Sequence, residues 1–159
     1  LAELLSAVAA ARQAGWPPVF LKVAPDLDPE APARIVEAVE KHGIDGIIVS
    51  NTTISRPELH SRHAGEAGGL SGASLKNLAL QRLRDFRKAS GGRIPLIGVG
   101  GIATADDAWA RIRAGASLVQ LYSAMVYEGP GIARAITAGL DTLMKRDGFA
   151  SIAEAVGSE

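Results

Sequence analysis

Short apolar runs recur along this chain, and a segment with helical spacing follows each of them. The runs cover residues 19–24, 46–50, 94–99 and 118–121, and few polar side chains interrupt them. A strand that is apolar on both faces is typical of a parallel sheet covered by helices. The pattern therefore predicts four parallel strands that alternate with helices.

The segments around these strands have the spacing of amphipathic helices. We expect helices over residues 4–12, 28–43, 75–86, 104–112 and 129–144. Two of these helices have clear start signals. Asp28 is expected to cap its helix, with Pro29 in the first turn. Thr104 and Asp107 have the spacing of a capping box.

Four βα units in succession are half of an eight-stranded (β/α)8 TIM barrel, a fold of about 250 residues. A doubly wound parallel sheet is the competing architecture. The barrel is favoured because two loops of the phosphate-binding kind follow the last two strands. We expect residues 1–159 to form a single α/β half-barrel segment. The chain begins with Leu1 and not with Met, which suggests a piece of a longer chain.

Composition narrows the range of functions. The chain is 47% hydrophobic, has no cysteine and carries a formal net charge of +0. A balanced charge without a basic stripe gives no electrostatic reason to expect nucleic acid. No run approaches the ~20 apolar residues that cross a bilayer. We assign no metal, and we interpret His60 and His63 as solvated loop residues because no further ligand lies at metal-binding spacing.

The strongest candidate site follows the third and fourth strands. Gly100 and Gly101 end the third strand directly before a capped helix, and Tyr122 and Ser123 end the fourth. In a β/α barrel these loops lie side by side at the carboxyl ends of the strands, beside the N-terminus of a short additional helix. Their backbone N–H groups predict a site for a phosphorylated ligand.

The first two strands add polar candidates. Lys22 interrupts an apolar strand, and it either lies in solvent on an edge strand or faces a ligand with negative charge. A buried ammonium needs such a partner because its desolvation is costly. Ser50, Asn51 and Thr52 follow the second strand, where they either cap the next segment or bind a planar polar ligand.

Residues 51–74 show no clear periodicity and include the glycine-rich run 68–72. A loop of this length inside a compact domain indicates a function, such as a lid over residues 54–67. The glycine-rich run is either a flexible turn or a place where the backbone approaches a ligand closely.

Five of these segments, taken in order, resemble one family. They are Leu-Lys-Val-Ala-Pro-Asp-Leu at 21–27, Ile-Val-Ser-Asn-Thr-Thr at 48–53, Gly-Gly-Leu-Ser-Gly at 68–72, Ile-Gly-Val-Gly-Gly-Ile at 97–102 and Ala-Gly-Ala-Ser-Leu-Val-Gln-Leu-Tyr-Ser at 114–123. Together they resemble the C-terminal half of a class 2, quinone-dependent dihydroorotate dehydrogenase, a flavoenzyme of pyrimidine synthesis. The resemblance covers nearly the whole chain.

The resemblance implies an oxidoreductase with an FMN-binding TIM barrel, which oxidises dihydroorotate to orotate and passes the electrons to a quinone. Lys22 would contact the flavin ring and favour its anionic reduced form. Asn51 and Thr52 would bind the pyrimidine substrate. The other residues that would contact FMN are Ser50, where the family usually has threonine, and Gly72, Gly100, Gly101, Tyr122 and Ser123.

Other parts of the family's machinery do not match this chain. The proton-abstracting serine of the family comes from an earlier loop, so no catalytic residue is assigned here. The helices of the quinone entrance would attach the family member peripherally to the inner membrane; we expect no counterpart of them in residues 1–159 and no membrane anchor in this segment.

Two alternatives remain, another TIM-barrel enzyme that binds FMN or phosphate, and an inactive half-barrel. A half-barrel exposes strand edges. We therefore expect the chain by itself to be poorly folded, self-associated or paired with the missing half-barrel.

Overall fold

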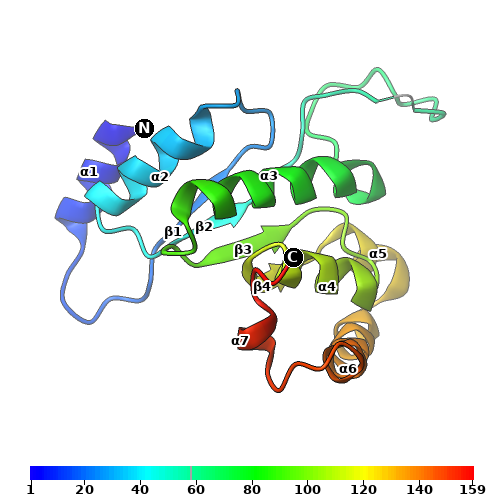
Figure 1. Ribbon diagram of the computed structural model, residues 1–159. Coiled ribbons are helices and arrows are strands. Elements are labelled where there is room, and N and C mark those ends of the chain that lie inside the picture. The colour runs from blue at the N-terminus through cyan, green and yellow to red at the C-terminus, as the bar shows by residue number, and fades with distance from the viewer. Residues whose placement is uncertain (58) are drawn as a thin grey trace.

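The computed structural model describes residues 1–57 and 59–159, and it contains a single parallel sheet (Figure 1). The strands are β1 (Phe20–Val23), β2 (Gly46–Val49), β3 (Leu96–Val99) and β4 (Ala116–Gln120). The helices are α1 (Ala2–Ala11), α2 (Ala31–Lys41), the 3-10 turn η1 (Gly72–Leu75), α3 (Lys76–Ser90), α4 (Ala105–Arg113), α5 (Ser123–Glu128), α6 (Gly131–Arg146) and α7 (Ile152–Ala155).

The strands lie side by side in the order in which they occur in the chain, β1-β2-β3-β4, and every neighbouring pair is parallel. This confirms the predicted four-stranded parallel sheet. A doubly wound sheet reverses its strand order at a switch point, whereas a β/α barrel adds each strand beside the previous one. The observed order therefore agrees with half of a barrel.

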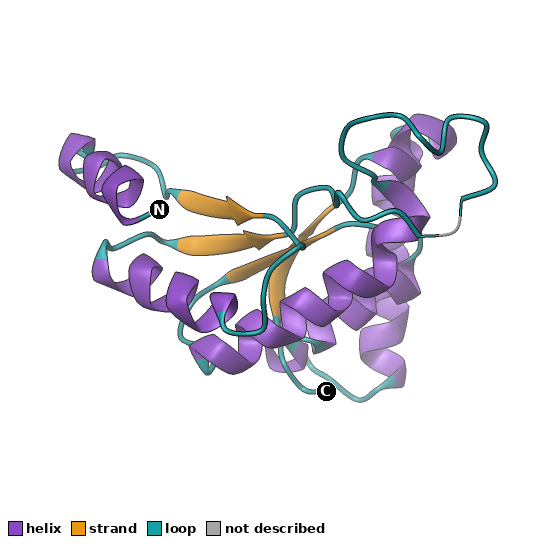
Figure 2. Cartoon of the chain, turned by 90° about the horizontal axis from the view of Figure 1, so that it is seen from above, coloured by secondary structure: helices purple, strands orange, loops and turns teal. Residues whose placement is uncertain are grey.

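One face of the sheet is covered by helices and forms the main core. Its strand side chains include Val23, Val49, Ile47 and Leu96, and α2 and α3 contribute Val39 and Phe86 among others. Both helices run along the same side of the sheet in the two perpendicular views (Figures 1 and 2). The apolar faces of α2 and α3 are thus buried against the strands, as their helical spacing predicts.

The opposite face of the sheet is open at the two edge strands, β1 and β4, whereas Ile97 of β3 is buried there. Lys22, Ile48, Ile97 and Leu118 are paired in register across the four strands, one position away from the core row. Leu118 remains 61% exposed and Phe20 37% exposed. Neighbouring residues of a strand point to opposite faces, so these side chains occupy the face that would line the interior of a closed barrel.

Some predicted boundaries were wrong. Strand β4 begins two residues earlier than its predicted start at Leu118, and the short helices α5 and α7 were not assigned from the sequence. Helix α2 begins at Ala31, so Pro29 precedes the helix and is not in its first turn. Asp28 still acts as a cap, since its carboxylate accepts hydrogen bonds from the backbone N–H of Glu30 and of Ala31.

The capping box at the start of α4 is confirmed. The Thr104 hydroxyl accepts a hydrogen bond from the Asp107 N–H, and the Asp107 carboxylate accepts one from the Thr104 N–H. At the C-terminal end of α3, Gly91 adopts a left-handed conformation that ends the helix. A capping box lies within four consecutive residues, which is why the sequence predicts the start of α4 correctly.

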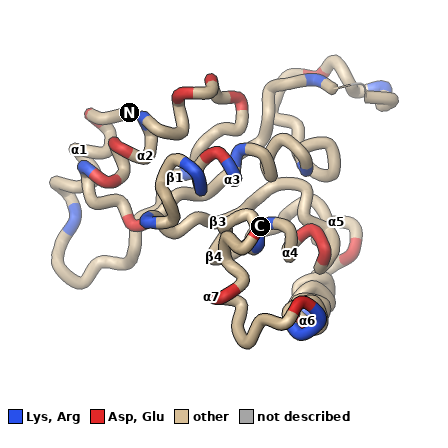
Figure 3. The backbone as a smooth tube through the Cα atoms, viewed as in Figure 1, with Lys and Arg blue, Asp and Glu red and all other residues tan. Residues whose placement is uncertain are grey.

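Charged residues are spread over the surface, with Lys and Arg interspersed with Asp and Glu along the chain (Figure 3). Within the described parts of the chain, no helix combines the length and the apolar character that crossing a bilayer requires.

Helices α4 and α6 form a second core with the C-terminal segment. Trp109 packs edge-on against Phe149, with the ring centroids 5.8 Å apart, and its indole N–H donates to the Asp147 carboxylate at 2.8 Å. Arg146 also donates to this carboxylate at 2.7 Å. These hydrogen bonds, from Arg146 first and Trp109 second, lower the pKa of Asp147 from 3.8 to about 2.

Stability should therefore depend on the ionisation of Asp147. A carboxylate with a lowered folded pKa contributes stability above its unfolded pKa and loses it as the pH falls toward the folded value. We expect Asp147→Asn to lower the free energy of unfolding at pH 7, with the difference from wild type shrinking between about pH 4 and pH 2. Denaturant titrations followed by tryptophan fluorescence at several pH values measure this difference. A difference that does not change with pH would contradict it.

Candidate functional site

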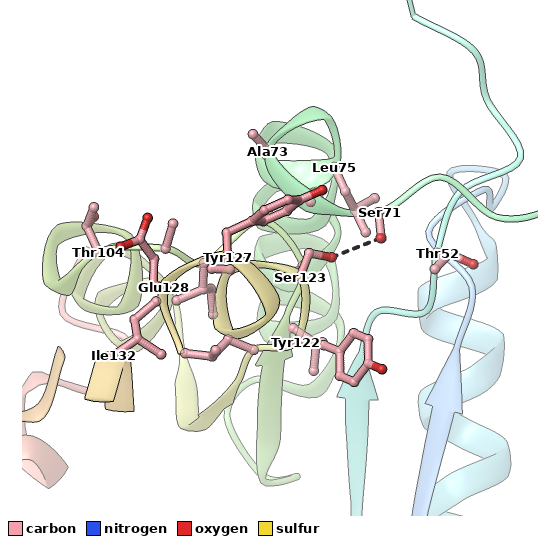
Figure 4. Close-up of a pocket in the computed structure, with 18 of the residues that line it drawn as sticks. Thr52, Ser71, Ala73, Leu75, Thr104, Tyr122, Ser123, Tyr127, Glu128 and Ile132 are labelled. Atoms are coloured by element: carbon pink, nitrogen blue, oxygen red, sulfur yellow. Dashed lines mark hydrogen bonds between the residues drawn. The ribbon is translucent and has the colours of Figure 1, made fainter. Parts of the chain in front are cut away.

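The carboxyl ends of the four strands surround a cavity of about 1070 Å³ (Figure 4). The structure brings all nine candidate residues to its walls: Lys22, Ser50, Asn51, Thr52, Gly72, Gly100, Gly101, Tyr122 and Ser123. They come from the ends of all four strands and from η1. A cavity at this edge of the sheet is the usual place for a ligand in parallel α/β proteins.

Lys22 combines features of both interpretations offered by the sequence. It lies on β1, an edge strand of the sheet, and its side chain is exposed. It also lines the cavity, on the open face of the sheet and beside Ile48 of β2. The ammonium group therefore stays hydrated and is at the same time available to a negatively charged ligand in the cavity.

The end of β2 holds its polar residues in different ways. Ser50 is buried, and its hydroxyl donates to the carbonyl of Asn51 at 2.9 Å. The backbone N–H of Asn51 donates to the carbonyl of Val23 at 2.7 Å, which ties this turn to β1. Thr52 is exposed at the cavity and lies against Gly69, where a Cβ atom would collide with its side chain. Asn51 and Thr52 thus have fixed backbones and accessible side chains.

Asp26 anchors the segment that follows these residues, a role that the sequence did not predict. Its carboxylate accepts hydrogen bonds from the Thr53 hydroxyl at 2.5 Å, the Ile54 N–H at 3.0 Å and the Ser55 hydroxyl at 2.9 Å. Burial raises the pKa of Asp26, but these hydrogen bonds together lower it by more than burial raises it, so the pKa lies below 3.8. The ionised carboxylate therefore holds the base of the loop in place.

The loop after β2 is closed at its base. Thr53 and Leu70 form an antiparallel bridge, and the guanidinium of Arg56 donates to the carbonyls of Glu66 and Gly68. The predicted lid at 54–67 includes residue 58, which lies outside the described residues, so the lid stays a prediction.

The two histidines of this loop are exposed, as expected. His63 nevertheless contacts the carboxylate of Glu66 at 2.5 Å, a partner that the sequence interpretation overlooked.

Two serines join the walls of the cavity. The Ser71 and Ser123 hydroxyls are 3.0 Å apart (Figure 4), although they lie 52 positions apart in the chain. The bond connects the segment before η1 with the first residue of α5. Gly72, next in the chain, has a φ of 76°, which favours glycine although a side chain would find room there.

The Gly100-Gly101 turn lies directly on α3. Gly100 and Gly101 have φ angles of 112° and 69°. A Cβ atom on Gly101 would lie 2.5 Å from the Cα atom of Lys76, and one on Gly100 would lie 3.0 Å from the side chains of Leu75 and Ala79. Both the backbone conformation and the close approach therefore require glycine at this turn.

Charged side chains lie behind this turn. Asp107 is 7% exposed, forms an ion pair with Lys76 and accepts hydrogen bonds from the N–H groups of Ala103 and Thr104. Burial raises the pKa of Asp107, but the bonds from Lys76 and the backbone lower it below 3.8 overall. The sequence interpretation treated Asp107 only as part of a helix start, because its ion pair with Lys76 spans distant segments.

The cavity extends past the candidate residues toward α4 and α6. Thr104, Glu128 and Ile132 lie on the side of the view opposite Thr52 (Figure 4), and Tyr127 also lines this part. None of these residues was a candidate from the sequence. Only helix α5, which the sequence did not assign, brings Tyr127 and Glu128 to the cavity.

Comparisons with known proteins agree with this architecture. The family model described as dihydroorotate dehydrogenase matches residues 1–144. Two curated relatives, both named dihydroorotate dehydrogenase (quinone), are 65% identical over the whole chain in Novosphingobium aromaticivorans and 67% identical in Erythrobacter litoralis. The chain spans about half the length of these relatives, 46% in each case.

Solved structures lead to the same family. The ligand-free DHODH from Eimeria tenella has a TM-score of 0.86 and 42% identity, over 90% of this chain and 40% of the other. The structure of the same enzyme in complex with ferulenol also has a TM-score of 0.86, with 41% identity over 91% of this chain and 39% of the other. The four parallel strands are part of a TIM barrel, and the chain belongs to the dihydroorotate dehydrogenase family.

Proposed function

We propose that this chain carries the FMN site and part of the substrate site of a quinone-dependent dihydroorotate dehydrogenase. The supporting observation is that all nine residues predicted for these two sites converge on one cavity at the carboxyl ends of the strands. Residues 1–159 would then be one half-barrel segment of an FMN-binding TIM-barrel domain.

The cavity has the properties that FMN requires. Its volume of about 1070 Å³ is sufficient for a nucleotide, and ligand pockets are commonly about 300–1,000 Å³. The Gly100-Gly101 turn has no side chains that would keep a ligand from the backbone, and Ser123 adds a hydroxyl to the same cavity. Lys22 supplies a cation on the neighbouring side. These groups would match the phosphate, the polar ring and the negative charge of FMN.

Different residues would bind different parts of the cofactor. Gly100, Gly101, Tyr122 and Ser123 would bind the phosphate through backbone N–H groups and hydroxyls. The remaining three, Lys22, Ser50 and Gly72, would lie along the flavin ring. FMN, when bound, supplies the capacity to accept two electrons from the substrate and to pass them to a quinone. The Lys22 ammonium would stabilise negative charge that develops on this side of the cavity.

Asn51 and Thr52 would orient the substrate. The Asn51 side-chain carbonyl already accepts the Thr52 N–H at 2.9 Å, which leaves the amide NH2 group free to donate to a pyrimidine carbonyl. The Thr52 hydroxyl can donate or accept. The group that abstracts the proton from dihydroorotate would come from the other half of the barrel, as would the quinone entrance and the peripheral attachment to the inner membrane.

A chimera tests the proposal directly. This chain would replace the matching 46% of the Novosphingobium aromaticivorans relative, with which it is 65% identical. We expect purified chimera to be yellow, to release FMN on denaturation, and to lose its flavin absorbance when dihydroorotate is added without oxygen. A colourless chimera that folds would contradict flavin binding. Flavin that dihydroorotate does not reduce would favour another FMN enzyme.

Two substitutions in the chimera separate cofactor from substrate binding. Lys22→Ala should weaken FMN retention or slow flavin reduction about tenfold or more, since it removes a cation from the site. Asn51→Ala should raise the KM for dihydroorotate about tenfold, the cost of losing a hydrogen bond, and leave the FMN content unchanged. Lys41→Ala, on the exposed end of α2, is the control. Unchanged flavin content and reduction rate in Lys22→Ala would remove Lys22 from the site.

The open face of the sheet should drive association of the isolated chain. Phe20 and Leu118 are exposed there, and their burial against a second copy or a missing half-barrel would be favourable. We expect oligomers in light scattering, and Leu118→Asp should raise the dissociation constant about tenfold or more. Ile54→Asp, also exposed but outside the sheet, should not. A monodisperse monomer that melts cooperatively would contradict this.

A further inference from the structure

Arg111 is a charged side chain in the interior, and none of the roles described so far accounts for it. It lies on α4 and is 2% exposed. Burial lowers the pKa of Arg111 to about 10, although the Asp107 carboxylate raises it in part, so the group is still protonated at neutral pH. A buried charge costs several kcal/mol unless hydrogen bonds offset its desolvation. Its contacts therefore indicate what it does.

Arg111 joins two walls of the cavity. One terminal nitrogen of its guanidinium, Nη2, donates to the carbonyl of Gly100 at 2.7 Å and to the carbonyl of Lys76 at 2.7 Å. Gly100 belongs to the turn after β3, and Lys76 begins α3 directly after η1, whose Gly72 and Leu75 line the cavity. The two carbonyls belong to segments that lie far apart in the chain, and Arg111 connects them.

The bond to Gly100 also orients the next N–H group. The carbonyl of Gly100 and the N–H of Gly101 belong to the same planar trans peptide unit and point in opposite directions. With the carbonyl turned toward Arg111, the Gly101 N–H points away from α4. Both glycines line the cavity. Among the described residues this N–H donates to no backbone carbonyl, so it is available to a ligand in the cavity.

The other end of the turn has its own anchor. Asp107 accepts the N–H groups of Ala103 and Thr104 and forms an ion pair with the Lys76 side chain. The segment from Gly100 to Thr104 is thus held at both ends by side chains of α4, and each of these side chains also contacts Lys76. The turn cannot shift along α3 without breaking a buried charged contact.

We propose that Arg111 is the positioning residue of the phosphate site: through the carbonyls of Gly100 and Lys76 it fixes the Gly100-Gly101 turn so that its N–H groups bind the phosphoryl group of the cofactor. The inference rests on the proposed function, since it assigns the phosphate end of FMN to this turn. Arg111 does not touch the ligand, and it acts only through the backbone.

The test compares two flavins in the chimera described above. FMN carries the phosphate, and riboflavin is the same molecule without it. Quenching of flavin fluorescence measures the dissociation constant of each. Arg111→Met should raise the dissociation constant of FMN at least about tenfold, because it removes the charge-assisted hydrogen bonds to the carbonyls of Gly100 and Lys76. The dissociation constant of riboflavin should change less than about threefold. A general loss of structure would weaken both flavins alike.

Further variants complete the design. Arg111→Lys keeps a donor for both carbonyls and should restore FMN binding to within about threefold of wild type. Arg113→Met, on the same helix, is the matched control, because Arg113 contacts Ser158 and Asp147 and does not line the cavity. If circular dichroism shows that Arg111→Met is unfolded, Arg111→Gln, which keeps a shorter amide donor, should show the same selective loss of FMN.

The outcomes separate the two proposals. A folded wild-type chimera that binds neither flavin would overturn the proposed function and this inference with it. A wild-type chimera that binds FMN, combined with an Arg111 variant that binds FMN equally well or loses both flavins equally, would overturn the inference alone.

Discussion

Parallel pairing of the four strands in chain order is the constraint on which the rest of the structure depends. Each strand lies beside the previous one and runs in the same direction, so the four carboxyl ends meet at one edge of the sheet. That edge collects residues from positions 22, 50–52, 100–101 and 122–123 around a single cavity. None of these segments is close to the next in sequence. Without the common strand direction, their polar side chains and glycine turns would be dispersed.

The same pairing makes the two faces of the sheet unequal. Helices α2 and α3 bury one face, where Ile47, Val49 and Leu96 are inaccessible to solvent. The other face carries Phe20, Lys22 and Leu118, all exposed. In a closed barrel these side chains would fill the interior. The chain spans 46% of the length of a curated relative, and further strands beside β1 or β4 would cover this face.

Behind the cavity, structure and proposed binding depend on the same charged side chains, of which Asp107 and Arg111 are buried and Lys76 is exposed. Lys76, Asp107 and Arg111 connect α3, α4 and the turn after β3. Hydrogen bonds to backbone groups offset part of the desolvation of Asp107 and Arg111, while the buried Arg111 Nε has no partner among the described residues. An apolar core could hold the helices together, but it could not direct individual peptide groups. Charged groups at these positions determine which way the turn presents its N–H donors.

Much of the fold and of the site could be predicted from the sequence, because it is encoded locally. The apolar runs predicted the four strands, the spacing of α2, α3 and α4 predicted the helices, and Thr104 with Asp107 predicted a helix start. The glycine pair, the glycine-rich run and the polar strand ends identified nine of the residues that line the cavity. Family membership followed from these motifs and is confirmed by the comparisons.

Tertiary structure alone decided the supporting contacts. Asp26 binds a hydroxyl 27 positions away, Arg111 binds a carbonyl 35 positions away, and Ser71 meets Ser123 across 52 positions. Such pairs leave no periodicity and no spacing rule in the sequence, because their distance depends on how whole strands and helices are arranged. The chain determined by itself which groups the site contains, through local patterns of residue type. Only the folded sheet decided which of them meet, because only the packing of distant segments sets those distances.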